Sequence, residues 1–144
     1  MAVHGNPTWS YLWRALLNTT YDRAVSDPQR YPVIRVIAPD QRDMGLSDRL
    51  AHRRLLRHSG NGGDYLALED RITDLQELLT VLIPEAEHPV FTLGHDWGGV
   101  ISLGAALRAH QAGSHHLAGL MTLNTAVHQS EDDPLPAPLR CAIH

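Results

Sequence analysis

One carboxylate stands between glycines in the segment Gly94-His95-Asp96-Trp97-Gly98-Gly99, which follows the short apolar run Pro-Val-Phe-Thr-Leu. Because Gly94 and Gly98 lack a Cβ atom, the backbone can turn sharply here from a strand into a tightly packed helix. Asp96 would then be exposed at the carboxyl end of the strand. A carboxylate in that position can attack an electrophilic carbon and form an ester with it. The spacing therefore predicts Asp96 as a nucleophile.

The same segment also fits a purely structural role. Aspartate is favoured at the N-cap of helices, and glycine is common in turns. The motif by itself is equally consistent with a strand-to-helix turn whose aspartate caps the helix.

A second segment near the start favours the catalytic interpretation. His4-Gly5-Asn6-Pro7 precedes Thr-Trp-Ser-Tyr-Leu-Trp-Arg. The Asn6 carboxamide and the Trp97 indole are neutral hydrogen-bond donors, which would not form an ion pair with Asp96. The backbone N–H of Trp97, at a helix N-terminus, can also stabilise negative charge. The alternatives are that Asn6 caps a helix with Pro7 in its first turn, and that Trp97 packs in the core.

Together with the segment Ala-Pro-Asp-Gln-Arg-Asp-Met-Gly-Leu-Ser-Asp at residues 38–48, the two motifs resemble one branch of the α/β-hydrolase superfamily. That branch contains haloalkane dehalogenases, β-lactone decarboxylases and epoxide hydrolases. The resemblance implies a nucleophile elbow in which Asp96 attacks, while Asn6 and Trp97 donate hydrogen bonds to a leaving halide or oxygen. The residues that would support the two motifs are His4, Gly5, Pro7, Gly94, His95 and Gly98.

The softer matches favour the decarboxylases within this branch. Epoxide hydrolases share Gly-His-Asp-Trp-Gly-Gly but usually carry an aromatic residue in place of Asn6. Dehalogenases share His-Gly-Asn-Pro-Thr and Tyr-Leu-Trp-Arg. The β-lactone decarboxylases share His-Gly-Asn-Pro-Thr-Trp-Ser, a segment like residues 64–79 with Arg71 and Asp74, and a run like Leu-Asn-Thr-Ala at 123–126. The resemblance implies a small hydrophobic substrate and no cofactor.

The periodicity predicts elements that could position these residues. Apolar residues at 9, 12, 13, 16 and 17 form one helical stripe, which we expect to pack on the sheet. Residues 33–38 have the pattern of a short, buried strand. A helix is predicted from Leu68 to Leu82, another from the elbow to Gly113, and a third strand at Leu117–Leu123. Alternating strands and helices indicate an α/β fold with a mainly parallel sheet in a three-layer sandwich, and ligands gather at the carboxyl ends of its strands.

The resemblance maps this 144-residue chain onto the central part of a larger hydrolase. Residues 1–127 would be a fragment of the hydrolase core that lacks the first strands, the lid and the C-terminal strands, and residues 128–144 an irregular tail. The general-base histidine of the family would also be missing, and Asn124 stands where some dehalogenases carry the supporting acid. Since histidine activates the water that releases such an ester, we expect the partial chain to be inactive or to react once.

Composition limits the other classes of function. The net charge of −4 argues against nucleic-acid binding, and no apolar segment is long enough for a membrane span. The single cysteine excludes an internal disulfide, no cysteine or carboxylate spacing suggests a metal site, and cytoplasmic residence is expected. A different class of function remains open, a non-catalytic remnant that associates with itself through exposed sheet edges.

Overall fold

The computed structural model describes residues 1–31, 34–49, 67–83, 88–114 and 117–125. Its three strands, β1 (Ala2–Val3), β2 (Val90–His95) and β3 (Leu117–Leu123), form a parallel sheet in the order β1-β2-β3. Helix α4 (Trp97–Gln111) packs on all three strands, and α3 (Leu68–Leu82) packs on α4. The α/β class with a parallel sheet is therefore confirmed. The boundary predicted at residue 127 lies outside the described residues.

The strand register brings two distant loops together. Ala2 pairs with Leu93 and Val3 with Gly94, so β1 ends beside the end of β2. Because the strands are parallel, the chain leaves both of them at the same edge of the sheet. The loop after β1 and the turn after β2 are therefore neighbours.

The core lies between the sheet and α3 with α4. In α3 the expected periodicity is confirmed, because Ile72, Leu75 and Leu79 are buried while the opposite face is exposed. The Asp70 carboxylate accepts a hydrogen bond from the backbone N–H of Ala67 at 3.2 Å, which caps the start of this helix. The remaining core residues are Val3, Val90, Ile101 and Ala105.

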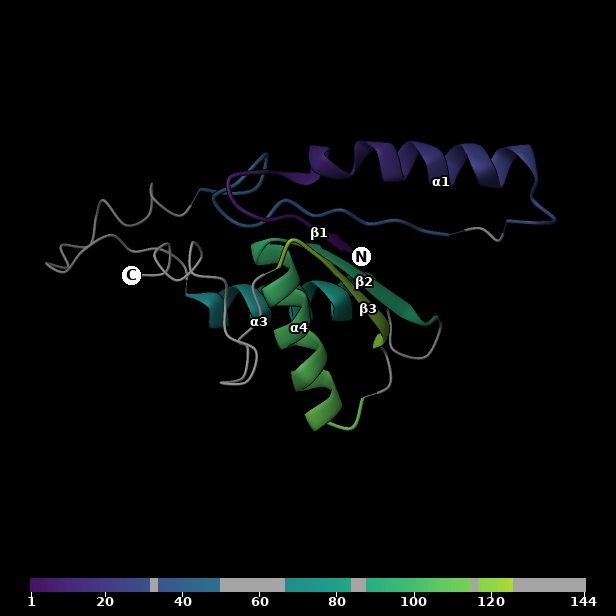
Figure 1. Cartoon of the computed structure of the whole chain (residues 1–144). Coiled ribbons are helices and arrows are strands. Elements are labelled where there is room, and N and C mark those ends of the chain that lie inside the picture. The colour runs from purple at the N-terminus through teal and green to yellow at the C-terminus, as the bar shows by residue number, and fades with distance from the viewer. Residues whose placement is uncertain (32–33, 50–66, 84–87, 115–116, 126–144) are drawn as a thin grey trace, which may run out of the picture.

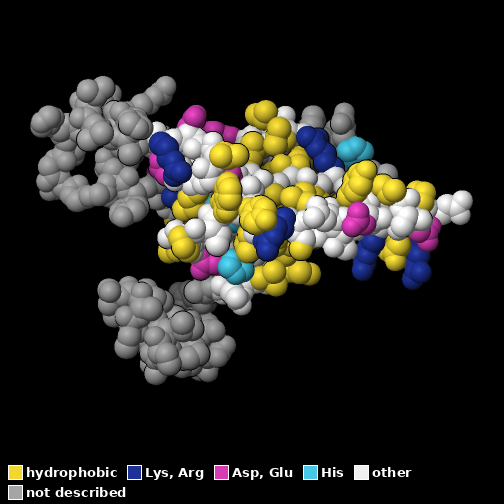
Figure 2. All heavy atoms as spheres, turned by 90° about the horizontal axis from the view of Figure 1, so that it is seen from above, with side chains coloured by type: hydrophobic (Ala, Val, Ile, Leu, Met, Phe, Trp, Pro, Cys, Tyr) yellow, Lys and Arg dark blue, Asp and Glu magenta, His cyan; other side chains and the backbone are white. Residues whose placement is uncertain are grey.

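The predicted packing of the first helical stripe is right for Trp13 and wrong for Trp9 and Leu17, while Leu12 and Leu16 are half-buried. The stripe falls in a short 3₁₀ helix, η1 (Ser10–Trp13), and in α1 (Arg14–Ser26). Trp13 is 6% exposed, but Trp9 is 43% exposed and no residue of α1 is buried. Figure 1 shows α1 on the β1 side of the sheet, away from α3 and α4. Figure 2, which views the molecule from above, shows hydrophobic side chains open on the surface. Among the large apolar residues of α1, Leu17, Tyr21 and Val25 are exposed.

The strand predicted at residues 33–38 is not formed, and Val33 lies outside the described residues. The segment meets β1 through one hydrogen bond, from Ala2 N–H to Ile37 O at 2.8 Å. That single hydrogen bond does not make a ladder, and the Ile34 side chain is exposed. Among the described residues, no further strand extends the sheet beyond β1 toward α1, and Leu17, Tyr21 and Val25 of this helix are exposed.

In the described part of the chain, no helix is long and apolar enough to cross a membrane.

We expect Gly98→Ala to lower the free energy of unfolding by about 2–3 kcal/mol. A Cβ atom there would collide with Val3 O and would lie 2.5 Å from His4 O, both backbone atoms that cannot move aside. Urea denaturation measures the effect. The matched control is Gly113→Ala, where no atom lies within 4 Å and the φ of 70° alone should cost about 1 kcal/mol. An equal loss of unfolding free energy in the two variants would contradict the close approach of Gly98 to the Val3 and His4 carbonyl groups.

Candidate active site at the carboxyl ends of β1 and β2

Asp96 occupies a strained backbone conformation between β2 and α4. Its φ of 54° and ψ of −125° lie in a region that non-glycine residues rarely adopt. Two hydrogen bonds hold it there, from Asp96 N–H to Leu123 O and from Gly99 N–H to Asp96 O, both at 3.0 Å. The turn is as sharp as the glycine spacing predicted.

Glycine is required on both sides of the turn. A Cβ atom on Gly94 would lie 2.5 Å from Gly98 O and from Gly99 Cα. Gly98 in turn packs against the carbonyl groups that end β1, at Val3 and His4. The missing side chains let the start of α4 approach both strands.

The Asp96 side chain does not cap α4. Although Asp96 is the N-cap residue, its carboxylate makes no capping hydrogen bond to the helix. Its Oδ2 accepts a hydrogen bond instead from the backbone N–H of Asn6, at 3.0 Å. A Cβ atom on Gly5 would collide with the Asp96 carboxylate, and would lie 2.5 Å from Asp96 Cβ. The carboxylate is therefore directed toward the loop after β1.

Asn6 meets Asp96 through its backbone rather than through its carboxamide. The loop is closed by two hydrogen bonds to Gly5 O, from Thr8 N–H at 3.0 Å and from Thr8 Oγ1 at 2.8 Å, and the Asn6–Pro7 peptide bond is cis. Asn6 does not cap the following helix, since η1 starts at Ser10 with Trp9 as its N-cap residue. Both the Asn6 and the Asp96 side chains reach solvent at this edge.

Trp97 opens α4 and is 51% exposed, so it does not pack in the core. As the first residue of the helix, its backbone N–H belongs to the group that has no partner within the helix. The positive end of the helix dipole therefore lies at this edge of the sheet, beside the turn that carries Asp96. Asp96, Asn6 and Trp97 are thus neighbours at one edge of the sheet, and their catalytic roles stay predictions.

His4 is fully buried at the end of β1 and is held by hydrogen bonds on both ring nitrogens. Its Nε2 accepts a hydrogen bond from Gln41 N–H at 3.0 Å, which assigns the ring proton to Nδ1, 2.9 Å from Gly5 O. Burial lowers the pKa of His4, because the protein interior disfavours the charged imidazolium. The ring is therefore a neutral structural support for the loop.

A polar cluster behind His4 was missed by the sequence reasoning. The Gln41 amide donates to His4 O and accepts from Arg71 Nη1 at 3.0 Å, and the Arg42 guanidinium forms a bidentate ion pair with Asp74. The available signal was the spacing of Arg71 and Asp74, which places both on one face of α3.

The Asp40 carboxylate links the turn at residues 41–46 to the start of η1 through hydrogen bonds. Burial raises the pKa of the Asp40 carboxyl, but hydrogen bonds from Leu46 N–H at 2.8 Å and Ser10 N–H at 2.6 Å outweigh burial, so that the pKa lies below its usual value. Gly45, with φ of 53°, leaves no room for a Cβ atom beside this carboxylate. The charged Asp40 therefore fixes the segment that carries Gln41 and Arg42.

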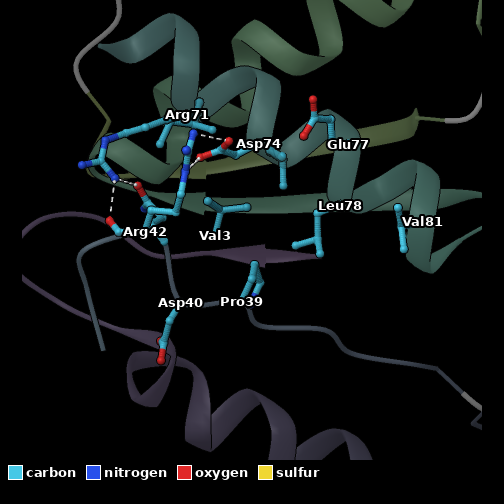
Figure 3. A pocket seen from close by; sticks show the side chains of 12 residues that line it. Val3, Pro39, Asp40, Arg42, Arg71, Asp74, Glu77, Leu78 and Val81 are labelled. Atoms are coloured by element: carbon cyan, nitrogen blue, oxygen red, sulfur yellow. Dashed lines mark hydrogen bonds and ion pairs between the residues drawn. The ribbon is translucent and has the colours of Figure 1, made fainter. Parts of the chain in front are cut away.

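The cavity in this part of the molecule is separate from Asp96. It has a volume of about 480 Å³ and lies between α3 and residues 39–42, with Val3 and Ile101 in its wall. Figure 3 shows Arg42 and Asp74 facing one another beside Arg71 at one end of it, and Val81 at the other. None of Asp96, Asn6 and Trp97 lines it. The candidate site therefore lies at Asp96, outside this cavity.

His95 and Asn124 lie beside the elbow, but neither side chain makes a hydrogen bond to the Asp96 carboxylate among the described residues. His95 ends β2 with its Nδ1 buried and without a partner among the described residues. Asn124 follows β3 directly, with φ of 48°. In the described part of the chain, no group of histidine, cysteine or acidic residues could hold a metal ion. The tail from residue 128 lies outside the described residues.

Comparison with known proteins places the chain among α/β-hydrolases. Residues 1–140 match the alpha/beta hydrolase fold family. The chain is 34% identical over 138 residues to a cis-3-alkyl-4-alkyloxetan-2-one decarboxylase of Shewanella oneidensis, covering 95% of this chain and 36% of the relative. It is 35% identical over 147 residues to the protein of that name in Xanthomonas campestris, covering 99% and 41%. A haloalkane dehalogenase of Mycolicibacterium smegmatis is 31% identical over 135 residues, covering 92% and 35%. The chain therefore spans about two fifths or less of the length of these relatives.

We expect the free energy of unfolding to fall as the pH drops from about 7.5 to about 5.5. Since the folded chain lowers the pKa of His4 below its ordinary value of about 6.5, the unfolded chain binds a proton there that the folded chain does not. His4→Gln should flatten this dependence, as measured by urea denaturation at each pH. His88→Gln, which removes an exposed imidazole, is the control. The prediction fails if both variants keep the slope of the original chain.

Proposed function

Because this chain belongs to the α/β-hydrolase fold family, we propose that Asp96 is the nucleophile of an enzyme that acts on a small hydrophobic electrophile. The substrate we favour is a β-lactone, with an alkyl halide as the next candidate and an epoxide as the third. The observation that carries the proposal concerns the Asp96 carboxylate, which makes no capping hydrogen bond to its own helix and accepts one through Oδ2 from the Asn6 N–H at 3.0 Å.

The first step would be attack by Asp96 Oδ1 on an electrophilic carbon. With an alkyl halide, the new ester C–O bond forms as the carbon–halogen bond breaks, and the halogen leaves with the electron pair as halide. The exposed Trp97 and Asn6 side chains are neutral N–H donors at this edge that could stabilise the departing anion. The Asn6 backbone N–H would meanwhile keep the attacking carboxylate in place.

A β-lactone can follow the same route without losing an atom at this stage. Attack on the ring sp³ carbon breaks its bond to the ring oxygen, which becomes a carboxylate still attached to the adduct. Loss of carbon dioxide with cleavage of the new ester bond would then give an alkene and restore Asp96. Attack on the ring carbonyl is the alternative. Two of the similar proteins are named for decarboxylation of an oxetan-2-one, which is a β-lactone, and this supports the preference.

Release of an ester formed from a halide needs a water molecule activated by a base. Among the described residues, no histidine imidazole makes a hydrogen bond to Asp96, and the residue after β3 is the carboxamide Asn124. A carboxamide cannot act as the anionic partner of an imidazolium. We therefore expect hydrolysis of a halide-derived ester to need a base from outside the described part.

Intact-mass spectrometry of the chain after exposure to a cis-3,4-dialkyloxetan-2-one, 1-bromohexane or 1,2-epoxyhexane tests the proposal. The epoxide should add its whole mass, and the bromide should exchange one hydrogen for a hexyl group. The lactone should add its whole mass only transiently, since the adduct would then release carbon dioxide and an alkene, which gas chromatography of the sample measures. Peptide mapping should place the adduct on Asp96. Asp96→Asn should reduce labelling by at least about 100-fold, because a carboxamide is a poor nucleophile.

Asp22→Asn is the matched control, since Asp22 is an exposed carboxylate on α1. This variant should be labelled at the rate of the original chain. Equal labelling of the Asp96→Asn variant, or adducts spread over surface carboxylates, would refute the assignment of the nucleophile.

A second candidate function is self-association without chemistry. One edge of β3 is unpaired within the described residues, and five of its seven residues are exposed. Met121 is 62% exposed on this strand, and Phe91 of β2 is 63% exposed. An exposed apolar edge strand is a template for pairing with another chain. We propose a second copy of this chain as the partner in this case.

If β3 mediates self-association, Met121→Lys should weaken it by about tenfold or more, since a charged residue on an edge strand opposes pairing. Sedimentation velocity over a range of concentrations measures the association constant. Leu107→Lys, at an exposed position on α4, is the control and should change little. A chain that stays monomeric at every concentration would exclude this candidate.

A further inference from the structure

We propose that Gln41 is a positioning residue that holds His4, and through it the loop after β1, so that the Asn6 N–H stays on the Asp96 carboxylate. The inference rests on the proposed nucleophilic role of Asp96. Among the described residues, the hydrogen bonds of the Gln41 side chain and backbone N–H go to His4 and Arg71 and not to Asp96. Its effect would be exerted entirely through the backbone of residues 4–6.

Gln41 makes two hydrogen bonds to His4. Its backbone N–H donates to His4 Nε2 at 3.0 Å, and its side-chain amide donates to His4 O. The first bond fixes the imidazole, and the second fixes the carbonyl of the peptide that joins His4 to Gly5. Since His4 is fully buried, neither bond competes with water at the His4 side.

Hydrogen bonds from α3 hold Gln41 in place. Arg71 Nη1 donates to Gln41 Oε1 at 3.0 Å and to Arg42 O at 3.5 Å. The Arg42 guanidinium forms its ion pair with Asp74 on the same helix. Two guanidinium groups therefore join the segment of residues 41–42 to α3, whose apolar face is part of the core. The Gln41 amide is held between a rigid helix and the His4 carbonyl.

The Asn6 N–H depends on the orientation of the peptide before it. The peptide that joins Gly5 to Asn6 has its carbonyl bonded to Thr8 and lies 2.9 Å from His4 Nδ1. If His4 shifts, that carbonyl shifts with it, and the N–H on the same peptide plane turns away from Asp96. A donor held in place before reaction needs no reorganisation during it, and displacement by about 1 Å can cost about 100-fold in rate.

Gln41→Met separates this role from folding. Methionine has nearly the same length and keeps the backbone N–H that reaches His4 Nε2, but it loses the bonds to His4 O and to Arg71. Gln76→Met is the matched control, because Gln76 lies on α3 and its Oε1 accepts from Arg108 Nη1 at 3.1 Å. That bond is remote from the loop after β1. Urea denaturation of both variants reports any general loss of stability.

The first readout is the amide proton of Asn6 in two-dimensional NMR spectra of the full chain during titration with acid. While it is bonded to Asp96 Oδ2, its chemical shift should follow protonation of that carboxylate. In the Gln41→Met variant we expect the amplitude of this shift to fall by more than half. In the Gln76→Met variant it should equal that of the original chain.

The second readout is the rate of labelling of Asp96 by 1-bromohexane, followed by intact mass at several concentrations. We expect Gln41→Met to lower the limiting rate constant by about 10- to 100-fold and to leave the half-saturating concentration unchanged. A loss of folding would instead change both quantities and lower the denaturation midpoint. Gln76→Met should label at the original rate.

The two proposals fail in different ways. If the original chain shows no Asp96 adduct, the proposed function fails, while the Asn6 titration still tests the positioning role. If the Asn6 amplitude is the same in the Gln41→Met variant as in the original chain, the positioning role is wrong whatever the labelling shows. The positioning role is also wrong if the Gln76→Met variant loses as much of the Asn6 shift amplitude as the Gln41→Met variant does.

Discussion

The closeness of the start of α4 to the end of β1 determines the rest of this site. Gly98 lies against the Val3 and His4 carbonyl groups, and Gly5 lies against the Asp96 side chain, with no space for a Cβ atom at either point. Two loops that are about 90 residues apart in the chain can therefore share one hydrogen bond, from Asn6 N–H to Asp96 Oδ2. A larger side chain at either glycine would separate the donor from the carboxylate.

This approach keeps Asp96 in a conformation with φ of 54°, which costs of the order of 1–3 kcal/mol. The cost is offset by the hydrogen bonds of its own backbone to β3 and α4 and by the packing of α3 and α4 on the sheet. The neutral, buried His4 and the Gln41–Arg71 pair support the opposite side of the same contact. Apolar packing of α3 and α4 thus holds the turn at Asp96, and the hydrogen bonds of His4, Gln41 and Arg71 orient the loop after β1 that faces it.

Much of the fold was predictable because it depends on local pattern. The boundaries of α3, the end of α4 before Gly113 and the span of β3 agree with the periodicity and the helix-ending residues. The failures have a common cause. The apolar stripe that runs from η1 into α1 and the apolar run at residues 34–38 indicate burial, but each needs a partner surface. The described sheet ends at β1, where Trp13 is the buried residue of the stripe. Periodicity reports which face is apolar and not what covers it.

The sequence by itself determined that an aspartate stands in a turn which glycine allows to be sharp, and that a His-Gly-Asn-Pro loop precedes it in the chain. These features depend on residue type and spacing, which need no other segment. The tertiary structure alone decided that the Asn6 backbone N–H, and not its carboxamide, meets Asp96, and that Gln41 and Arg71 support His4. Those contacts join three segments whose relative positions follow from strand register and helix packing, and no local pattern encodes them.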